Sequence, residues 1–162
     1  MVVMWPIPMH IYSQFATSLF EERERHVDAN VIEHIWLQYE GYTWFVQMMM
    51  NELFALTPSG HTCAAAMIPE ALRNVIMSQE QSYKDTLSNI PPKQKMVLQA
   101  IAKEGVAHNV TSSKFVKKYN LNSASSVQSA IRLLMKNDML AHTDEGYRVY
   151  DYFLSDWLAT VF

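Results

Sequence analysis

The stretch over residues 91–150 constrains the fold more than any other part of this chain. Pro91-Pro92 begins a run of apolar residues at helical spacing, and this run ends at Gly105. A second, shorter run begins at Thr111-Ser112-Ser113. A third run, over residues 123–137, follows the tripeptide Asn120-Leu121-Asn122. These spacings predict three consecutive helices joined by short turns.

A hairpin is predicted after the third helix. Two short segments of alternating apolar residues flank Asp144-Glu145-Gly146, a sequence typical of a tight turn. Asp151 then begins a final run at helical spacing that includes Trp157. Three helices and a hairpin within about 60 residues are the components of a winged helix-turn-helix. Residues 91–162 are therefore predicted to form such a domain, with one additional helix at its C-terminal end.

Residues 9–90 are predicted to form a separate helical domain. Four runs at helical spacing indicate helices over residues 9–25, 28–41, 44–56 and 68–89. The third of these is apolar almost all the way round, which predicts that it is buried. Val2-Val3-Met4-Trp5 predicts a β-strand in residues 1–8, and nothing else in the chain offers it a partner strand. The predicted fold class is mainly α, with a helical bundle followed by a winged helix-turn-helix that carries a two-stranded wing.

The charges are divided unevenly between the two halves. The net charge of the chain is −3. Residues 1–90 hold four Lys or Arg and ten Asp or Glu (−6), whereas residues 91–162 hold nine and six (+3). A net charge of +3 is only mildly basic, so it is compatible with a nucleic-acid partner but does not establish one.

Composition also bounds the location of the chain. The single cysteine, Cys63, excludes an internal disulfide and a cysteine-based zinc site, which favours a reducing cytoplasm. No apolar run approaches the ~18–20 residues that a membrane-spanning helix needs. We therefore expect a cytoplasmic protein without a membrane partner.

The sequence offers little for catalysis. Its six histidines are scattered without the spacing of a metal site. Its four glycines all lie at predicted element ends, so there is no glycine-rich loop to hold phosphates. We expect no enzymatic activity, no metal site and no cofactor in this chain.

Several residues of the predicted winged helix are candidates for contact with DNA. Hydroxyl, amide and guanidinium groups on the third helix suit base edges and phosphates in a major groove, and lysines on the second helix and an arginine in the wing suit phosphates. The candidates are Lys114, Lys117, Lys118, Ser123, Ser125, Ser126, Gln128, Ser129, Arg132 and Arg148. The alternative is that Ser123 caps the helix and the others are solvated surface residues. The acidic wing tip argues against deep insertion of the wing beside a phosphate backbone.

The order of these parts resembles the C-terminal portion of a prokaryotic AAA-type ATPase, of the archaeal-ATPase-like group allied to signal-transduction ATPases. The resemblance rests on Val2-Val3-Met4-Trp5-Pro6-Ile7-Pro8, Tyr39-Glu40-Gly41-Tyr42-Thr43-Trp44-Phe45, Pro92-Lys93-Gln94-Lys95-Met96-Val97-Leu98, Ser125-Ser126-Val127-Gln128-Ser129-Ala130, Gly146-Tyr147-Arg148-Val149-Tyr150-Asp151 and Trp157-Leu158. It implies a final core strand, a helical lid and a winged helix, with ATP and Mg²⁺ bound only by the parent protein. Thr43 stands where many relatives have proline.

Two functions follow as hypotheses. The first is a non-catalytic C-terminal fragment of such an ATPase, a lid and winged-helix module for regulation, protein interaction or weak DNA binding. The alternative is a free-standing winged-helix transcription regulator whose helical half dimerises. The expected partners are the missing ATPase core or another protein chain, double-stranded DNA, and a second copy of the chain in a homo-oligomer.

Overall fold

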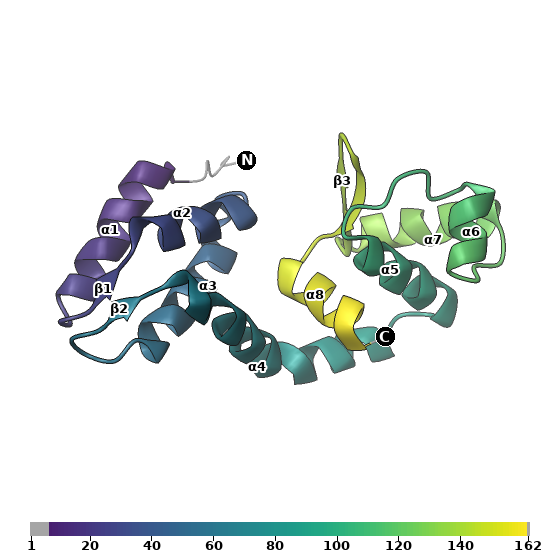
Figure 1. Cartoon of the computed structure of the whole chain (residues 1–162). Helices are drawn as coiled ribbons and strands as arrows, with labels where there is room; N and C mark the ends of the chain where they lie inside the picture. The colour runs from purple at the N-terminus through teal and green to yellow at the C-terminus, as the bar shows by residue number, and fades with distance from the viewer. Residues whose placement is uncertain (1–6, 162) are drawn as a thin grey trace. The chain divides into compact units, whose positions relative to one another are not determined.

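The computed structural model describes residues 7–161, which are mainly helical (Figure 1). The predicted strand Val2-Val3-Met4-Trp5 lies outside the described residues. The chain divides into two compact units, one up to Ser78 and one from Gln79 onward.

The first unit is built from helices α1 (Met9–Glu21), α2 (Ala29–Gln38) and α3 (Thr43–Leu56), a 3-10 turn η1 (Ala65–Met67) and the first half of α4 (Ile68–Ser88). All four predicted helices are present. The first ends about a turn earlier than predicted, because Glu24 takes a positive φ of 56° and the Arg25 amide donates to the Phe20 carbonyl. The core of the unit contains Tyr12, Phe20, Val31, Ile32, Ile35, Met49, Leu53, Ala71 and Val75.

The apolar helix α3 is buried on one side only. Met49 and Met50 belong to the core, whereas Gln47 and Asn51 are exposed. The prediction that this helix is buried therefore holds for one side of it and not for the other. Its polar residues are few, but Gln47 and Asn51 lie four positions apart and so share one face of the helix.

A short parallel β-pair was not predicted. Strand β1 (His26–Val27) pairs with β2 (Thr62–Cys63), so that His26 lies opposite Thr62 and Val27 lies opposite Cys63. Each strand has only two residues, which is too short for an alternating pattern to be recognised.

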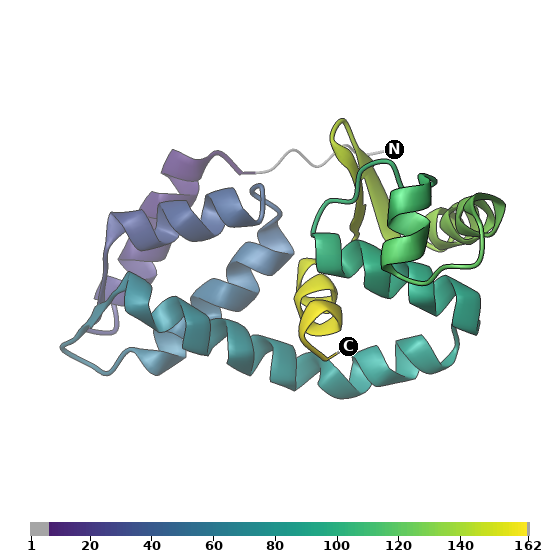
Figure 2. The ribbon, with the colours of Figure 1, turned by 45° about the vertical axis from the view of Figure 1, so that its right-hand side comes forward.

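The second unit has the predicted winged-helix architecture. It contains α5 (Pro92–Glu104), α6 (Ser113–Lys118), α7 (Ala124–Lys136), the strands β3 (Leu140–Thr143) and β4 (Gly146–Val149), and α8 (Tyr152–Val161). Within this unit, α6 packs beside α7, as both views show (Figure 1, Figure 2).

The wing is an antiparallel hairpin with a third segment at its edge. Leu140 pairs with Val149, and Thr143 pairs with Gly146 across the turn. Ala107 adds a short bridge to Tyr147, with N–O distances of 2.7 and 3.0 Å between their backbones. The loop between α5 and α6 is thereby attached to the wing.

The second half of α4 belongs to the winged-helix unit. Buried Tyr83 packs against Trp157 of α8 with ring centroids 5.6 Å apart. The Trp157 indole N–H donates to Glu80 at 3.4 Å. The division at Ser78 and Gln79 consequently falls inside a helix, instead of at Pro91-Pro92 as the sequence suggested.

Candidate nucleic-acid interface

Helix α7 presents one polar face to solvent. Val127, Ala130, Ile131 and Leu134 are buried, and α7 packs against α5. The helical period then leaves the opposite side chains exposed, and these include four of the predicted DNA-binding residues: Ser125, Gln128, Ser129 and Arg132. Lys136, one turn beyond Arg132, is exposed as well and was missed in the sequence.

Ser123 has a structural role at the start of α7. Its hydroxyl accepts a hydrogen bond from the Ser126 amide at 3.1 Å and lies 3.1 Å from the Ser125 hydroxyl. Ser123 is thus the N-cap, as one of the two sequence interpretations held. Ser123 and Ser126 are half-buried, which leaves Ser125 as the more accessible hydroxyl at this end of α7.

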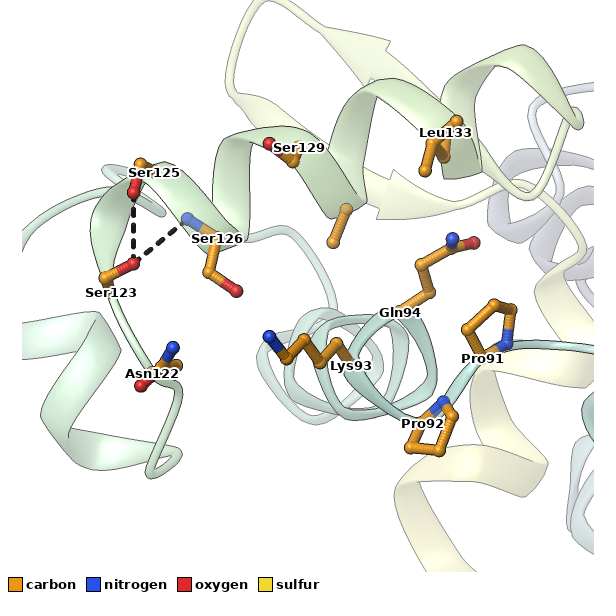
Figure 3. Close-up of a pocket in the computed structure, with 11 residues that line it drawn as sticks. Pro91, Pro92, Lys93, Gln94, Asn122, Ser123, Ser125, Ser126, Ser129 and Leu133 are labelled. Atoms are coloured by element: carbon orange, nitrogen blue, oxygen red, sulfur yellow. Dashed lines mark hydrogen bonds between the residues drawn. The ribbon is translucent and has the colours of Figure 1, made fainter.

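A groove with a cavity volume of about 740 Å³ separates α7 from the start of α5. Lys93 and Gln94 extend from α5 toward α7, and the hydroxyl of Ser126 points into the same space (Figure 3). Pro92 and Leu133 line its apolar part. Lys93 therefore places an exposed amine beside the hydroxyl-lined side of α7, a role that the sequence did not indicate.

Lys118 is paired within the protein. Its amine lies 2.7 Å from the Glu104 carboxylate, which also accepts a hydrogen bond from the Tyr119 hydroxyl at 2.6 Å. The hydrogen bond from Lys118 is the main cause that lowers the pKa of Glu104, and the same bond raises the pKa of Lys118. Both groups are therefore held in their charged forms, and Glu104 offsets the charge that Lys118 was predicted to offer to DNA.

Arg148 lies at the base of the wing and is turned toward the protein. Its guanidinium donates to the carbonyls of Val149 and Tyr150, each at 3.0 Å, and stacks over the Tyr152 ring at 4.4 Å from the centroid. The prediction that Arg148 reaches a phosphate from the wing has to be revised, because these contacts direct its side chain toward α8.

The remaining cations are concentrated around α6 and α7. Residues 105–137 contain five Lys or Arg and no Asp or Glu, a local charge of +5. Apart from Lys118, these are Lys114, Lys117, Arg132 and Lys136, and all four are exposed. The acidic tip, Asp144 and Glu145, is exposed at the end of the wing. The positive surface thus follows the helix-turn-helix and does not include the wing.

Across residues 7–161, no group of three or more His, Cys, Asp or Glu side chains is arranged to hold a metal ion. In the same residues, none of the helices combines the length and the apolar character that crossing a membrane requires.

A comparison with protein families agrees with this geometry. Residues 81–160 match the family described as a probable winged helix domain. The match begins in the second half of α4 and ends in α8, so it covers the winged-helix unit as the structure delimits it. A winged helix domain suggests a DNA-binding or regulatory role. No curated protein and no solved structure matched the chain.

Proposed function

We propose that the winged-helix unit binds duplex DNA through the exposed face of α7, and that the chain acts by binding and regulation without catalysis. One observation supports this most directly: the exposed face of α7 carries hydroxyl, amide and guanidinium groups within a segment that holds four exposed cations besides the paired Lys118 and contains no Asp or Glu. A helix with such a face fits the major groove of B-DNA, as the second helix of a helix-turn-helix does.

The side chains divide into two roles. Gln128 and Arg132 have the geometry for bidentate contacts, to adenine and guanine respectively, and Ser125 can bond to either partner of a base pair. Lys114, Lys117 and Lys136 supply charge for phosphates, which fixes position without reading sequence. The acidic tip of the wing is repelled by the phosphate backbone, so we expect the wing to stay outside the groove.

The affinity follows from the number of available cations. Three phosphate contacts, from Lys114, Lys117 and Lys136, give a slope of about −2.7 in log affinity against log salt concentration. With so few contacts, binding to random duplex at physiological salt should be weak, on the order of 10⁻⁵ M. A sequence-selective nanomolar complex on genomic fragments would instead favour the free-standing transcription regulator.

Fluorescence anisotropy with a labelled duplex tests the proposal. The double variant Lys114→Glu/Lys117→Glu should lose binding while its helix content stays unchanged, because both side chains are exposed. Lys84→Glu/Lys103→Glu changes the net charge equally at exposed positions outside α6 and α7, and it should bind nearly as well as the natural chain. Equal loss in both double variants would contradict binding through this face.

The relation to AAA-type ATPases stays a prediction. The family match covers the winged-helix unit alone and does not extend to the helical unit. In the proposal, any ATP and Mg²⁺ would belong to a separate ATPase core, because the four glycines of this chain form no phosphate-binding loop.

A further inference from the structure

Helix α1 carries an exposed apolar stripe in the first unit. Ile7 lies just before the helix, and Ile11, Phe15 and Leu19 follow at intervals of four residues. Their side chains are 42, 49, 52 and 43% exposed in that order. Residues four apart in a helix lie on the same side, so Ile11, Phe15 and Leu19 form a single row, and Ile7 precedes this row in the chain. The opposite side of α1 buries Tyr12, Ala16 and Phe20 in the core of the unit.

The stripe is neutral along the helix itself, and charged residues, Glu22 and Arg23, line the groove beside it only past the end of α1. From Met9 to Phe20 the sequence contains no Asp, Glu, Lys or Arg, and exposed neighbours of the stripe include Gln14 and Ser18. A solvated helix surface ordinarily carries charged residues on its outer face. A row of large apolar side chains without charges is instead typical of a surface that another protein covers.

The stripe also forms one wall of a groove. Phe15 and Leu19 of α1 face Gln47 and Asn51 of α3 across a cavity of about 380 Å³. Phe20 and Phe54 also line the groove and contact each other edge to face, with ring centroids 5.1 Å apart. The groove can thus receive a large apolar side chain between α1 and α3.

The two ends of α1 do not complement its dipole: the N-terminal end lacks a favourable carboxylate, and the C-terminal end carries two unfavourable ones. Its first turn contains no acidic residue, and within the described residues no side chain caps it. Its last turn contains no basic residue, and the helix ends at exposed Glu21 with Glu22 as its C-cap. Carboxylates are favourable at helix N-termini and unfavourable at C-termini, so both ends are arranged against the stability of an isolated helix.

We propose that this stripe is the interface at which a second copy of the chain binds, with the two α1 helices antiparallel about a two-fold axis at Phe15. This register places Phe15 against its equivalent and Ile11 against Leu19. It also places Glu21 and Glu22 beside the uncapped first turn of the partner helix, where their charges are favourable. The neutral polar neighbours bring no like charges together, so the surface is complementary to itself.

The extent of the stripe indicates a weak dimer. Four large side chains that are about half exposed offer on the order of 350 Å² per copy, if each offers roughly 200 Å² when fully exposed. Stable protein interfaces bury about 800 Å² per partner. Self-association should therefore depend on concentration and be populated only toward the upper micromolar range.

Sedimentation equilibrium of the full chain, from about 5 to about 500 µM, measures this association. The average mass should rise toward that of a dimer with concentration. Phe15→Glu places two carboxylates at the two-fold axis and should leave the chain monomeric throughout. Met77→Glu is the matched control, because Met77 is 71% exposed on α4, outside the stripe, and this variant should associate like the natural chain.

A second variant separates association from folding. Glu21→Lys/Glu22→Lys puts cations at the C-terminal end of α1, which favours the isolated helix, but it also puts them beside the N-terminus of the partner helix. Its melting temperature should stay the same or rise, while its dimer dissociation constant rises at least tenfold. If the natural chain stays monomeric at about 500 µM, the proposal is overturned, and the partner of the stripe would be a different protein. Equal effects of Phe15→Glu and Met77→Glu, or tighter association of the lysine variant, would also overturn it.

Discussion

Replacing Gly146 with alanine should destabilise the winged-helix unit far more than the position of this residue in a surface turn suggests. Gly146 has a φ of +147°, a conformation that residues with a side chain rarely adopt. A Cβ atom at this position would overlap the Ala107 carbonyl oxygen and would lie 2.9 Å from the Ala107 carbonyl carbon. Both are backbone atoms, so the overlap cannot be relieved by rotation of a side chain. The wing would have to move away from the loop that precedes α6.

The magnitude follows from two contributions. Backbone strain at a conformation of this kind costs about 1–3 kcal/mol. Separating Ala107 from Tyr147 breaks their two backbone hydrogen bonds, of 2.7 and 3.0 Å, at about 0.5–1.5 kcal/mol each. Together these reduce the free energy of unfolding by about 2–6 kcal/mol, a large part of the 5–15 kcal/mol that is typical of a domain.

Gly105→Ala is the control within the same unit. Gly105 has a φ of +73° in a turn closed by the Val106 amide and the Glu104 carbonyl at 2.9 Å, but a Cβ there would meet no atom within 4 Å. The free energy of unfolding of Gly105→Ala should fall only by the backbone strain, about 1–3 kcal/mol. Urea unfolding monitored by tryptophan fluorescence, to which buried Trp157 of this unit contributes, compares the two variants. Equal losses, or a loss below about 1 kcal/mol for Gly146→Ala, would refute the argument from the Ala107 contact.

Three further predictions concern charge and ligands. Glu104→Gln should release Lys118 from its ion pair, so that DNA affinity rises and the salt slope steepens by about 0.9; unchanged salt dependence would contradict this. Burial raises the pKa of Asp156 above its usual 3.8, and the nearby charge of Asp151 contributes a smaller increase. The folded state therefore holds this proton more tightly than the unfolded state, and the ionised form reduces stability at neutral pH. Asp156→Asn should accordingly raise the melting temperature at pH 7. This gain should shrink at lower pH, where Asp156 is protonated in the natural chain. A melting temperature that falls at pH 7 would contradict this prediction. Calorimetric titration with Mg-ATP should show no binding, and a micromolar dissociation constant would disprove the absence of a nucleotide site.

Local chemistry made the winged helix predictable. The turn sequence Asp144-Glu145-Gly146 directly adjoins the two strands that it connects. The hairpin forms around it, with Thr143 paired to Gly146. The buried face of α7 follows in the same way from the period of Val127, Ile131 and Leu134. Lys136 could have been found by this reasoning, because it lies four residues after Arg132 on the same exposed face.

Other features depend on contacts that no local pattern carries. The pairing of β1 with β2 joins residues more than thirty positions apart, and it involves two residues on each side. The orientation of Arg148 depends on two backbone carbonyls and on the Tyr152 ring. Whether a lysine such as Lys118 is paired depends on an acid fourteen residues away. Sequence periodicity identifies the face on which a side chain lies, but not the partner that it meets there.

Helix α4 contributes to both hydrophobic cores, with Ala71 and Val75 in one and Tyr83 and Leu87 in the other. The division between the units therefore has no loop at which a protease can cut without first opening a helix. When either unit unfolds, it removes support from a helix that the other unit also uses. We therefore expect a mutation that unfolds the winged-helix unit to lower the stability of the helical unit as well.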